Sequence, residues 1–332
     1  MSSIAERFIP DKLQKGDTVR VVAPSWSLSL IDKDRRELAN KKLEKIGLVV
    51  TFGEHVEETD IFNSSSVDSR VEDVHQAFLD PQVKAILTVI GGYNSNQLLQ
   101  HLDWDIIKRH PKIFCGFSDI DVLNNAIYAK TGLVTYSGPL YSSFSQKLYF
   151  EYTKEYFEKC LMSNEPFTLI PNQYWSDDEW YKDQEKRQLV ANEGNTVIHE
   201  GEATGIVVGT NLCTINILQG TEFFPDLEGV ILFLEDDYLS PPSAFDRNLQ
   251  SLVQQKKFAA VNGLVFGRFQ KKSGMTNDLL RIIIESKREL KNMPIIASAN
   301  FGHTDPKATI PIGGITRINA IGQHGTIEFL EH

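Results

Sequence analysis

Several absences in the sequence narrow the classes of protein that it can encode. The 332 residues contain only three cysteines, Cys115, Cys160 and Cys213, which are widely spaced. Such usage is typical of free thiols in a reducing compartment, and the lack of CxxC or HExxH spacing argues against a zinc site. No apolar run approaches membrane-spanning length, and no segment near the start has the pattern of a signal peptide. We therefore expect a cytoplasmic protein with no membrane contact, no metal and no other cofactor.

The sequence also lacks an excess of basic residues. Lysine and arginine number 34 against 44 aspartates and glutamates, which gives a net charge of −10. Binding to nucleic acid needs cations that neutralise phosphates, and the best basic run, 182–187, is broken by Asp183 and Glu185. We therefore expect no nucleic-acid partner. A hydrophobic content of 41% is ordinary for a globular protein, and the length is sufficient for two domains.

Predicted strands and helices alternate along the first half of the chain. Short apolar segments predict strands at 18–23, 48–52, 84–90 and 112–115, and amphipathic segments predict helices at 32–47, 66–80, 96–102, 104–110 and 119–130. Continuous apolar strands between helices indicate an α/β fold with a parallel sheet of the Rossmann or flavodoxin-like kind. Functional groups collect at the carboxyl ends of such strands, which places Ser25, Gly91–Gly92 and Ser118 along one edge.

The composition changes in the middle of the chain. We expect an N-terminal α/β domain over 1–165, a connector or lid over 166–200, and a C-terminal α/β domain with short strands over 201–332. The connector is acidic and carries Trp175 and Trp180. Its aromatic side chains serve either as a binding surface or as anchors that attach the connector to its neighbours, and the sequence leaves both open.

Predicted elements of the second half follow the same alternation. Strands are expected at 205–209, 230–234, 263–266 and 294–299, helices at 211–219, 244–255 and 277–287, and short strands within 308–330.

One turn has the pattern that presents a nucleophile. Ser118 follows the strand 112–115 and the chain-breaking Gly116, and it directly precedes the amphipathic run 119–130. A serine in a tight strand-to-helix turn is lifted off the backbone, and the N–H groups that open the helix can stabilise an anion beside it. The alternative is that Ser118 caps the helix, since serine is among the best capping residues.

A serine nucleophile needs a base and an acid that orients the base. His303 follows the strand 294–299, so it is a candidate base, although it could instead be a turn histidine capped by a neighbour. Glu235 directly follows the strand 230–234 and is the candidate acid. The acids at 235–237 also suggest a metal site or a glycosidase pair, but adjacent strand residues point to opposite faces.

At this point the residues resemble a known family, the murein LD-carboxypeptidase-like serine peptidases. The similarity extends in order over nearly the whole chain, and it is carried by Gly91-Gly92-Tyr93, Gly116-Phe117-Ser118-Asp119-Ile120, Gly209-Thr210-Asn211-Leu212, Leu232-Phe233-Leu234-Glu235-Asp236 and Gly302-His303-Thr304-Asp305-Pro306. The resemblance implies a Ser-Glu-His triad of Ser118, Glu235 and His303, with the N–H groups of Gly92 and Asp119 as the oxyanion hole.

Two positions depart from the family pattern, and the connector points to one branch. Phe117 stands where the family commonly has tyrosine, and Thr210 stands within a stretch that is commonly Gly-Gly-Asn-Leu. The departure at Thr210 puts the local backbone conformation in doubt. The aromatic connector resembles that of microcin C immunity peptidases, which cleave the amide between an acyl group and an aminoacyl-nucleotide-like moiety. Trp180 could then stack on a base.

The hypothesis is therefore a serine carboxypeptidase or amidase that acts on a microcin C-type peptidyl nucleotide. Asn211 and Arg247 are candidate ligands for a substrate carboxylate or phosphate, although Arg247 could equally form an interdomain salt bridge. The first alternative is a murein LD-carboxypeptidase that releases the terminal D-alanine of cell-wall tetrapeptides. A more remote alternative is a non-catalytic, two-lobed ligand-binding protein. The resemblance also suggests a homodimer.

Overall fold

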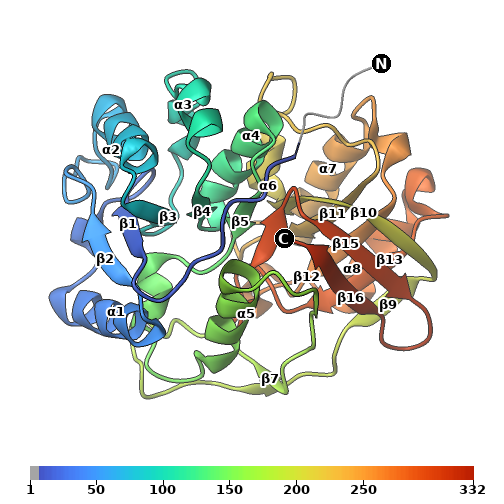
Figure 1. Cartoon of the computed structure of the whole chain (residues 1–332). Helices are drawn as coiled ribbons and strands as arrows, with labels where there is room; N and C mark the ends of the chain where they lie inside the picture. Colours follow the sequence, from blue (N-terminus) through green and yellow to red (C-terminus); the bar gives the residue numbers. More distant parts are fainter. Residues whose placement is uncertain (1–6) are drawn as a thin grey trace.

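The first of two large β-sheets is mostly parallel in the computed structural model, which describes residues 7–332 (Figure 1). Its order is β14-β5-β4-β3-β1-β2, where β1 to β5 are parallel and β14 is antiparallel to β5. The bounds are β1 Thr18–Val22, β2 Val49–Phe52, β3 Val83–Thr88, β4 Ile113–Cys115, β5 Thr135–Ser137 and β14 Ile310–Ile312. The sequence predicts a parallel sheet of the Rossmann or flavodoxin-like kind, and the parallel part has the flavodoxin-like order.

Helices cover both faces of this sheet (Figure 1). On one face lie α1 (Lys33–Ile46) and α5 (Glu151–Met162), and on the other lie α2 (Val67–Leu79), α3 (Trp104–Arg109) and α4 (Asp121–Thr131). The sequence signals for helix ends are confirmed in α1, where Asp32 caps the first turn and Gly47 ends the helix in the left-handed region. The helix expected over 96–102 is only a short 3₁₀ turn, Ser95–Leu98.

The second sheet is mixed and has the order β6-β16-β15-β10-β11-β12-β13-β9. Strands β10 to β13 are parallel, and the flanking strands are antiparallel. Helices α6, α7 and α8 pack on one face. The bounds are β6 Phe167–Thr168, β9 Thr196–His199, β10 Gly201–Asn211, β11 Val230–Glu235, β12 Gly263–Gly267, β13 Ile295–Ala299, β15 Ile315–Ala320, β16 Thr326–Glu331, α6 Leu212–Asn216, α7 Pro242–Val253 and α8 Asn277–Glu285.

The connector links the two halves of the chain and contributes two strands to the second sheet. Within 166–200, β7 (Tyr174–Trp175) and β8 (Val190–Ala191) pair with each other, whereas β6 and β9 join the second sheet. In turn, β14 comes from the C-terminal part of the chain and joins the first sheet. The division at residues 165 and 200 stays a prediction.

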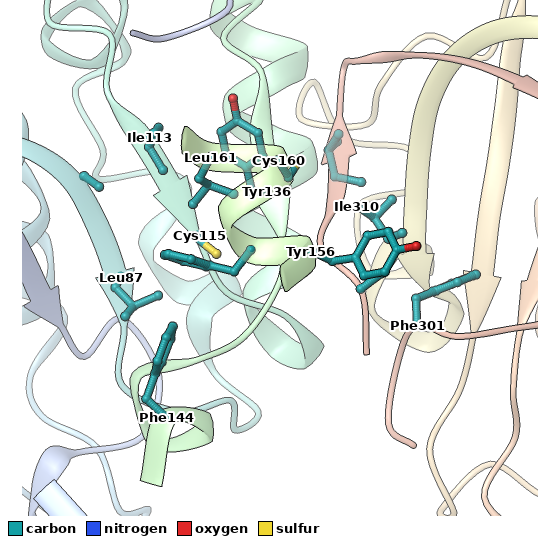
Figure 2. Packing of buried hydrophobic residues seen from close by; sticks show 14 of the residues in the cluster. Leu87, Ile113, Cys115, Tyr136, Phe144, Tyr156, Cys160, Leu161, Phe301 and Ile310 are labelled. Carbon is teal, nitrogen blue, oxygen red and sulfur yellow. The ribbon is translucent and has the colours of Figure 1, made fainter. Parts of the chain in front are cut away.

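One hydrophobic cluster spans both sheets. It contains Leu87 and Cys115 from the first sheet and Phe233 from the second. Figure 2 shows members of this cluster, among them Tyr156 of α5 and Phe301. Burial of this shared cluster holds the two sheets together. Within the described residues, no helix is both long and apolar enough to cross a membrane.

Candidate active site

Ser118 lies in a strained turn between β4 and α4. Its φ is +70°, which is uncommon for a residue other than glycine and recurs at functional sites. Residues 118–120 form a 3₁₀ turn, so α4 begins at Asp121 and its N-cap position is Ile120. Ser118 therefore does not cap α4, and its hydroxyl is available for other contacts.

His303 contacts both Ser118 and Glu235. The distance from His303 Nε2 to Ser118 Oγ is 2.9 Å, and the distance from His303 Nδ1 to Glu235 Oε2 is 2.8 Å. A carboxylate can only accept, so Nδ1 carries a proton in either charge state of His303, and Nε2 can accept the serine hydroxyl once the imidazole is neutral. Phe117 packs against the imidazole with ring centroids 5.2 Å apart. The structure thus brings together the three residues that the sequence places at the ends of separate strands.

Glu235 is fully buried, and it accepts hydrogen bonds with both carboxylate oxygens. Oε2 accepts from the backbone N–H of His303 at 3.1 Å, and Oε1 accepts from Asn211 Nδ2 at 3.1 Å. Two glycines leave room for this side chain: a Cβ on Gly302 would lie 2.5 Å from Glu235 Oε2, and one on Gly267 would lie 2.9 Å from Glu235 Cβ. Larger residues at either position would displace the carboxylate.

The electrostatics of the site favour a charged imidazole in the free protein. Burial alone would lower the pKa of His303, but the charge and hydrogen bond of Glu235 outweigh it, with Asp237 adding to the effect, so the pKa is raised to about 9. At neutral pH the His303–Glu235 pair is therefore an ion pair, and His303 must lose its proton before it can act as a base.

The glycine turn after β3 lies against Ser118. A Cβ on Gly91 would be 3.0 Å from Ser118 Cβ and 3.7 Å from the backbone nitrogen of Asp119. Among residues 7–332, no backbone acceptor is found for the N–H of Gly92. A Cβ on Gly92 would approach Ser25 Oγ to 2.3 Å, so only glycine fits there. The role of the Gly92 and Asp119 N–H groups as an oxyanion hole stays a prediction.

The side chain of Asp119 makes contacts that were not predicted from the sequence. Its Oδ2 accepts from Ser25 Oγ at 2.6 Å and from the Ser95 N–H at 2.9 Å. The carboxylate therefore links the segments that follow β1 and β3 to the nucleophile turn. Ser25 and Asp119 both follow predicted parallel strands, whose carboxyl ends lie at one edge of the sheet, and this pattern could have predicted their contact.

The three predicted substrate contacts lie in different surroundings. Asn211 is 2% exposed and holds Glu235, while its Oδ1 caps α6 by accepting from the Thr214 N–H at 3.0 Å. Trp180 is half-buried, with the Arg35 guanidinium 5.4 Å from its ring centroid. Arg247 is exposed on α7. Substrate contact by these three residues stays a prediction.

The acids at 235–237 do not form the alternative sites considered for them. Glu235 faces His303, whereas Asp236 Oδ1 accepts from the Asp237 N–H at 3.2 Å. In the part of the chain that the structure describes, no group of three or more histidine, cysteine, aspartate or glutamate side chains is arranged to hold a metal ion.

Comparison with protein families gives two matches that together cover most of the chain. The profile of the LD-carboxypeptidase N-terminal domain matches residues 19–138, and that of the LD-carboxypeptidase C-terminal domain matches residues 204–318.

Three relatives are similar over nearly their full length. YocD of Bacillus subtilis (strain 168), whose carboxypeptidase name is provisional, is 53% identical over 97% of this chain and 99% of its own. Another protein of that strain, provisionally named a murein peptide carboxypeptidase, is 30% identical over 97% of this chain and 94% of its own. The microcin C7 self-immunity protein MccF of Escherichia coli is 30% identical over 91% of this chain and 90% of its own.

Solved structures are similar to the same extent. The crystal structure of an MccF-like protein from Bacillus anthracis str. Ames superposes with a TM-score of 0.97 at 53% identity, covering 98% of this chain and all of that one. The microcin C7 self-immunity protein MccF in complex with aspartyl sulfamoyl adenosine gives a TM-score of 0.87 at 27% identity, covering 98% of this chain and 99% of that one.

Proposed function

The chain belongs to the LD-carboxypeptidase family and is a serine peptidase, and we propose that Ser118, His303 and Glu235 are its catalytic triad. The observation that carries this proposal is the hydrogen-bond chain from Ser118 Oγ to His303 Nε2 at 2.9 Å and from His303 Nδ1 to Glu235 Oε2 at 2.8 Å. Nucleophile, base and acid in this order form the arrangement that activates a serine. Family membership makes the chain an enzyme, which removes the non-catalytic binding protein from the alternatives.

In the proposed reaction, Ser118 Oγ attacks the scissile carbonyl carbon and its proton passes to His303 Nε2. The carbonyl oxygen becomes an oxyanion that the N–H groups of Gly92 and Asp119 stabilise, each by about 3 kcal/mol. His303 then gives the proton to the leaving amine, and an acyl ester forms on Ser118. Water, deprotonated by His303, attacks this ester and releases the acid, which restores the serine.

We propose that the substrate is an aminoacyl or peptidyl nucleotide whose acyl group is joined through an amide bond. Support comes from the likeness to MccF, which has been solved with aspartyl sulfamoyl adenosine. Trp180 offers an aromatic ring for a base, and Arg247 offers an exposed guanidinium for an anionic group.

A murein tetrapeptide is the second candidate substrate. The observation in its favour is the 30% identity to a relative provisionally named a murein peptide carboxypeptidase. Both substrates have an amide bond at the reacting centre, so the same triad would serve either.

The test is to incubate the purified protein separately with aspartyl sulfamoyl adenosine and with an L,D-linked murein tetrapeptide, and to identify the products by mass spectrometry. We expect free aspartate from the first substrate and little or no D-alanine from the second. Ser118→Ala should lose turnover by a factor on the order of 10⁴ or more. Ser251→Ala on α7, where the hydroxyl bonds Gln219, is the matched control. Release of D-alanine alone would reverse the substrate assignment, and full turnover by Ser118→Ala would overturn the triad.

A further inference from the structure

A buried carboxylate lies directly beneath the nucleophile turn. Asp121 is the first residue of α4 and is fully buried. Its Oδ2 accepts from the Ser118 N–H at 3.2 Å and from the hydroxyl of Thr210, and its Oδ1 accepts from Asn124 Nδ2 at 2.9 Å. All three partners donate, so the site is matched to a group that only accepts.

Thr210 brings this carboxylate into contact with the second sheet. It lies near the end of β10 with φ at +156°, a backbone conformation that favours glycine. Its hydroxyl bonds Asp121 and also lies 3.0 Å from Ser137 Oγ of β5. The departure from glycine at this position, which the sequence left unexplained, thus adds a hydroxyl donor at the cost of backbone strain.

Neighbouring residues hold the same strand end. The backbone of Gly209 exchanges two hydrogen bonds with the Asn125 side chain of α4, at 3.1 Å and 2.8 Å. On the other side of Thr210, Asn211 donates to Glu235. Residues 209–211 are therefore fixed to α4 on one side and to the catalytic acid on the other.

These contacts close a circuit through the active site. Ser118 bonds Asp121, and Asp121 bonds Thr210 of the second sheet. The adjacent Asn211 bonds Glu235. Glu235 bonds His303, which returns to Ser118. Every bond of the circuit joins groups whose relative position decides whether Ser118 is aligned with its base.

We propose that Asp121 and Thr210 are positioning residues. Their mutual hydrogen bond fixes the Ser118 turn relative to the end of β10, where Asn211 donates a hydrogen bond to Glu235. The proposal rests on the assignment of Ser118, Glu235 and His303 made above. A structural role alone would not need an ionisable group, because burying a carboxylate opposes folding. Burial raises the pKa of Asp121 to about 7, although the bonds from Thr210 and Asn124 act in the opposite direction.

The test uses substitutions that change hydrogen bonding with little change in shape. Asp121→Asn puts a donor where only donors surround it, Thr210→Val removes the hydroxyl, and Thr210→Ser keeps it. Thr131→Val is the matched control, because Thr131 is a buried threonine at the far end of α4 whose hydroxyl bonds Ile127 O at 2.7 Å. Folding is checked by circular dichroism and thermal unfolding.

We expect Asp121→Asn and Thr210→Val to lower kcat, and the rate at which a fluorophosphonate labels the serine, by about tenfold or more, because misalignment slows attack. KM should change little, since the side chains of Asp121 and Thr210 are both buried beneath the Ser118 turn. Thr210→Ser should recover most of the loss, and Thr131→Val should alter only the unfolding temperature.

Results that contradict the positioning role differ from results that contradict the catalytic triad. A folded Thr210→Val protein that is labelled at the wild-type rate, or that changes KM alone, would overturn the positioning role. If Asp121→Asn does not fold, the Thr210→Val and Thr210→Ser pair decides. Labelling that persists in Ser118→Ala would instead overturn the proposed function.

Discussion

At the scale of single residues, the central feature is the pairing of His303 with a fully buried Glu235. The folded-state pKa of His303, about 9, lies above its ordinary value of 6.5. The pair therefore contributes stability that is fully present below pH 6.5 and is lost as the pH rises through about 9. The base form that catalysis needs appears over the same range.

This coupling predicts the pH dependence of kcat/KM. The wild-type value should rise with pH and level off above about 9, because His303 of the free enzyme loses its proton with that pKa. Glu235→Gln removes the main group that raises this pKa. The midpoint of the rise in kcat/KM should therefore move to or below the ordinary histidine pKa of 6.5. The maximal rate should fall by a factor on the order of 10³, because the amide no longer holds the required tautomer.

The pH–rate profile of the free enzyme measures both effects. Glu228→Gln, at an exposed acid that pairs with Lys257, is the control and should leave the profile in place. If the midpoint of the profile stays near 9 in Glu235→Gln, another group controls the ionisation of His303.

Much of the site was predictable at this scale, because strand ends of an α/β fold gather functional side chains. Ser118, Glu235 and His303 each follow an apolar strand, and the structure brings them within hydrogen-bond distance. The bond between Asp121 and Thr210 was not predictable, because it joins α4 to β10 of the second sheet across 89 positions of the sequence. Periodicity reports only which face of a helix is apolar.

At the scale of elements, the connector contacts both halves of the chain. Ser176 and Asp305 exchange backbone hydrogen bonds of 2.7 Å and 2.8 Å, two residues beyond His303. Farther along, Gln184 donates to Ser145 O at 2.8 Å in the first half of the chain. The connector's aromatic residues include Trp175, which is packed against Arg268. Trp175 therefore anchors the connector, one of the two roles that the sequence left open.

A buried ion pair within the connector should set its stability. The side chains of Arg187 and Asp178 are 3% and 11% exposed, and Arg187 Nε lies 2.9 Å from Asp178 Oδ1. Asp178→Asn leaves the guanidinium buried without its counter-charge, so we expect unfolding to become easier by about 3 kcal/mol. Limited proteolysis should then cut within 176–190 faster than in the wild type.

The control for this prediction is Asp183→Asn, which removes the partner of the exposed Lys186 in the same segment. Exposed ion pairs contribute little to folding stability, so the proteolysis rate and the unfolding of Asp183→Asn should match those of the wild type. Equal stability of Asp178→Asn and the wild type would mean that the pair does not hold the connector.

Element types were predicted better than element lengths. Strand β10 was expected over 205–209 and extends over Gly201–Asn211, because it pairs with β11 on one side and β15 on the other. Helix α6 was expected over 211–219 and ends at Asn216. Pairing partners far along the chain decide such ends, and local sequence does not encode them.

At the scale of the whole molecule, the candidate site exists only where the two sheets meet. Ser118 follows β4 of the first sheet, whereas Glu235 ends β11 of the second. The shared hydrophobic cluster and the bonds of α4 to β10 hold these parts in register. A cytoplasmic location and a homodimer remain predictions from the sequence and the family resemblance.

The most direct test of the central claim is the site of covalent labelling by a fluorophosphonate. The wild-type protein is labelled at neutral to mildly alkaline pH, digested with trypsin and mapped by mass spectrometry. The triad predicts a single phosphonyl adduct on Ser118, within the peptide 113–130, that is absent from Ser118→Ala and formed far more slowly by His303→Ala. An adduct on a different serine, or equal labelling of Ser118→Ala, would contradict the account.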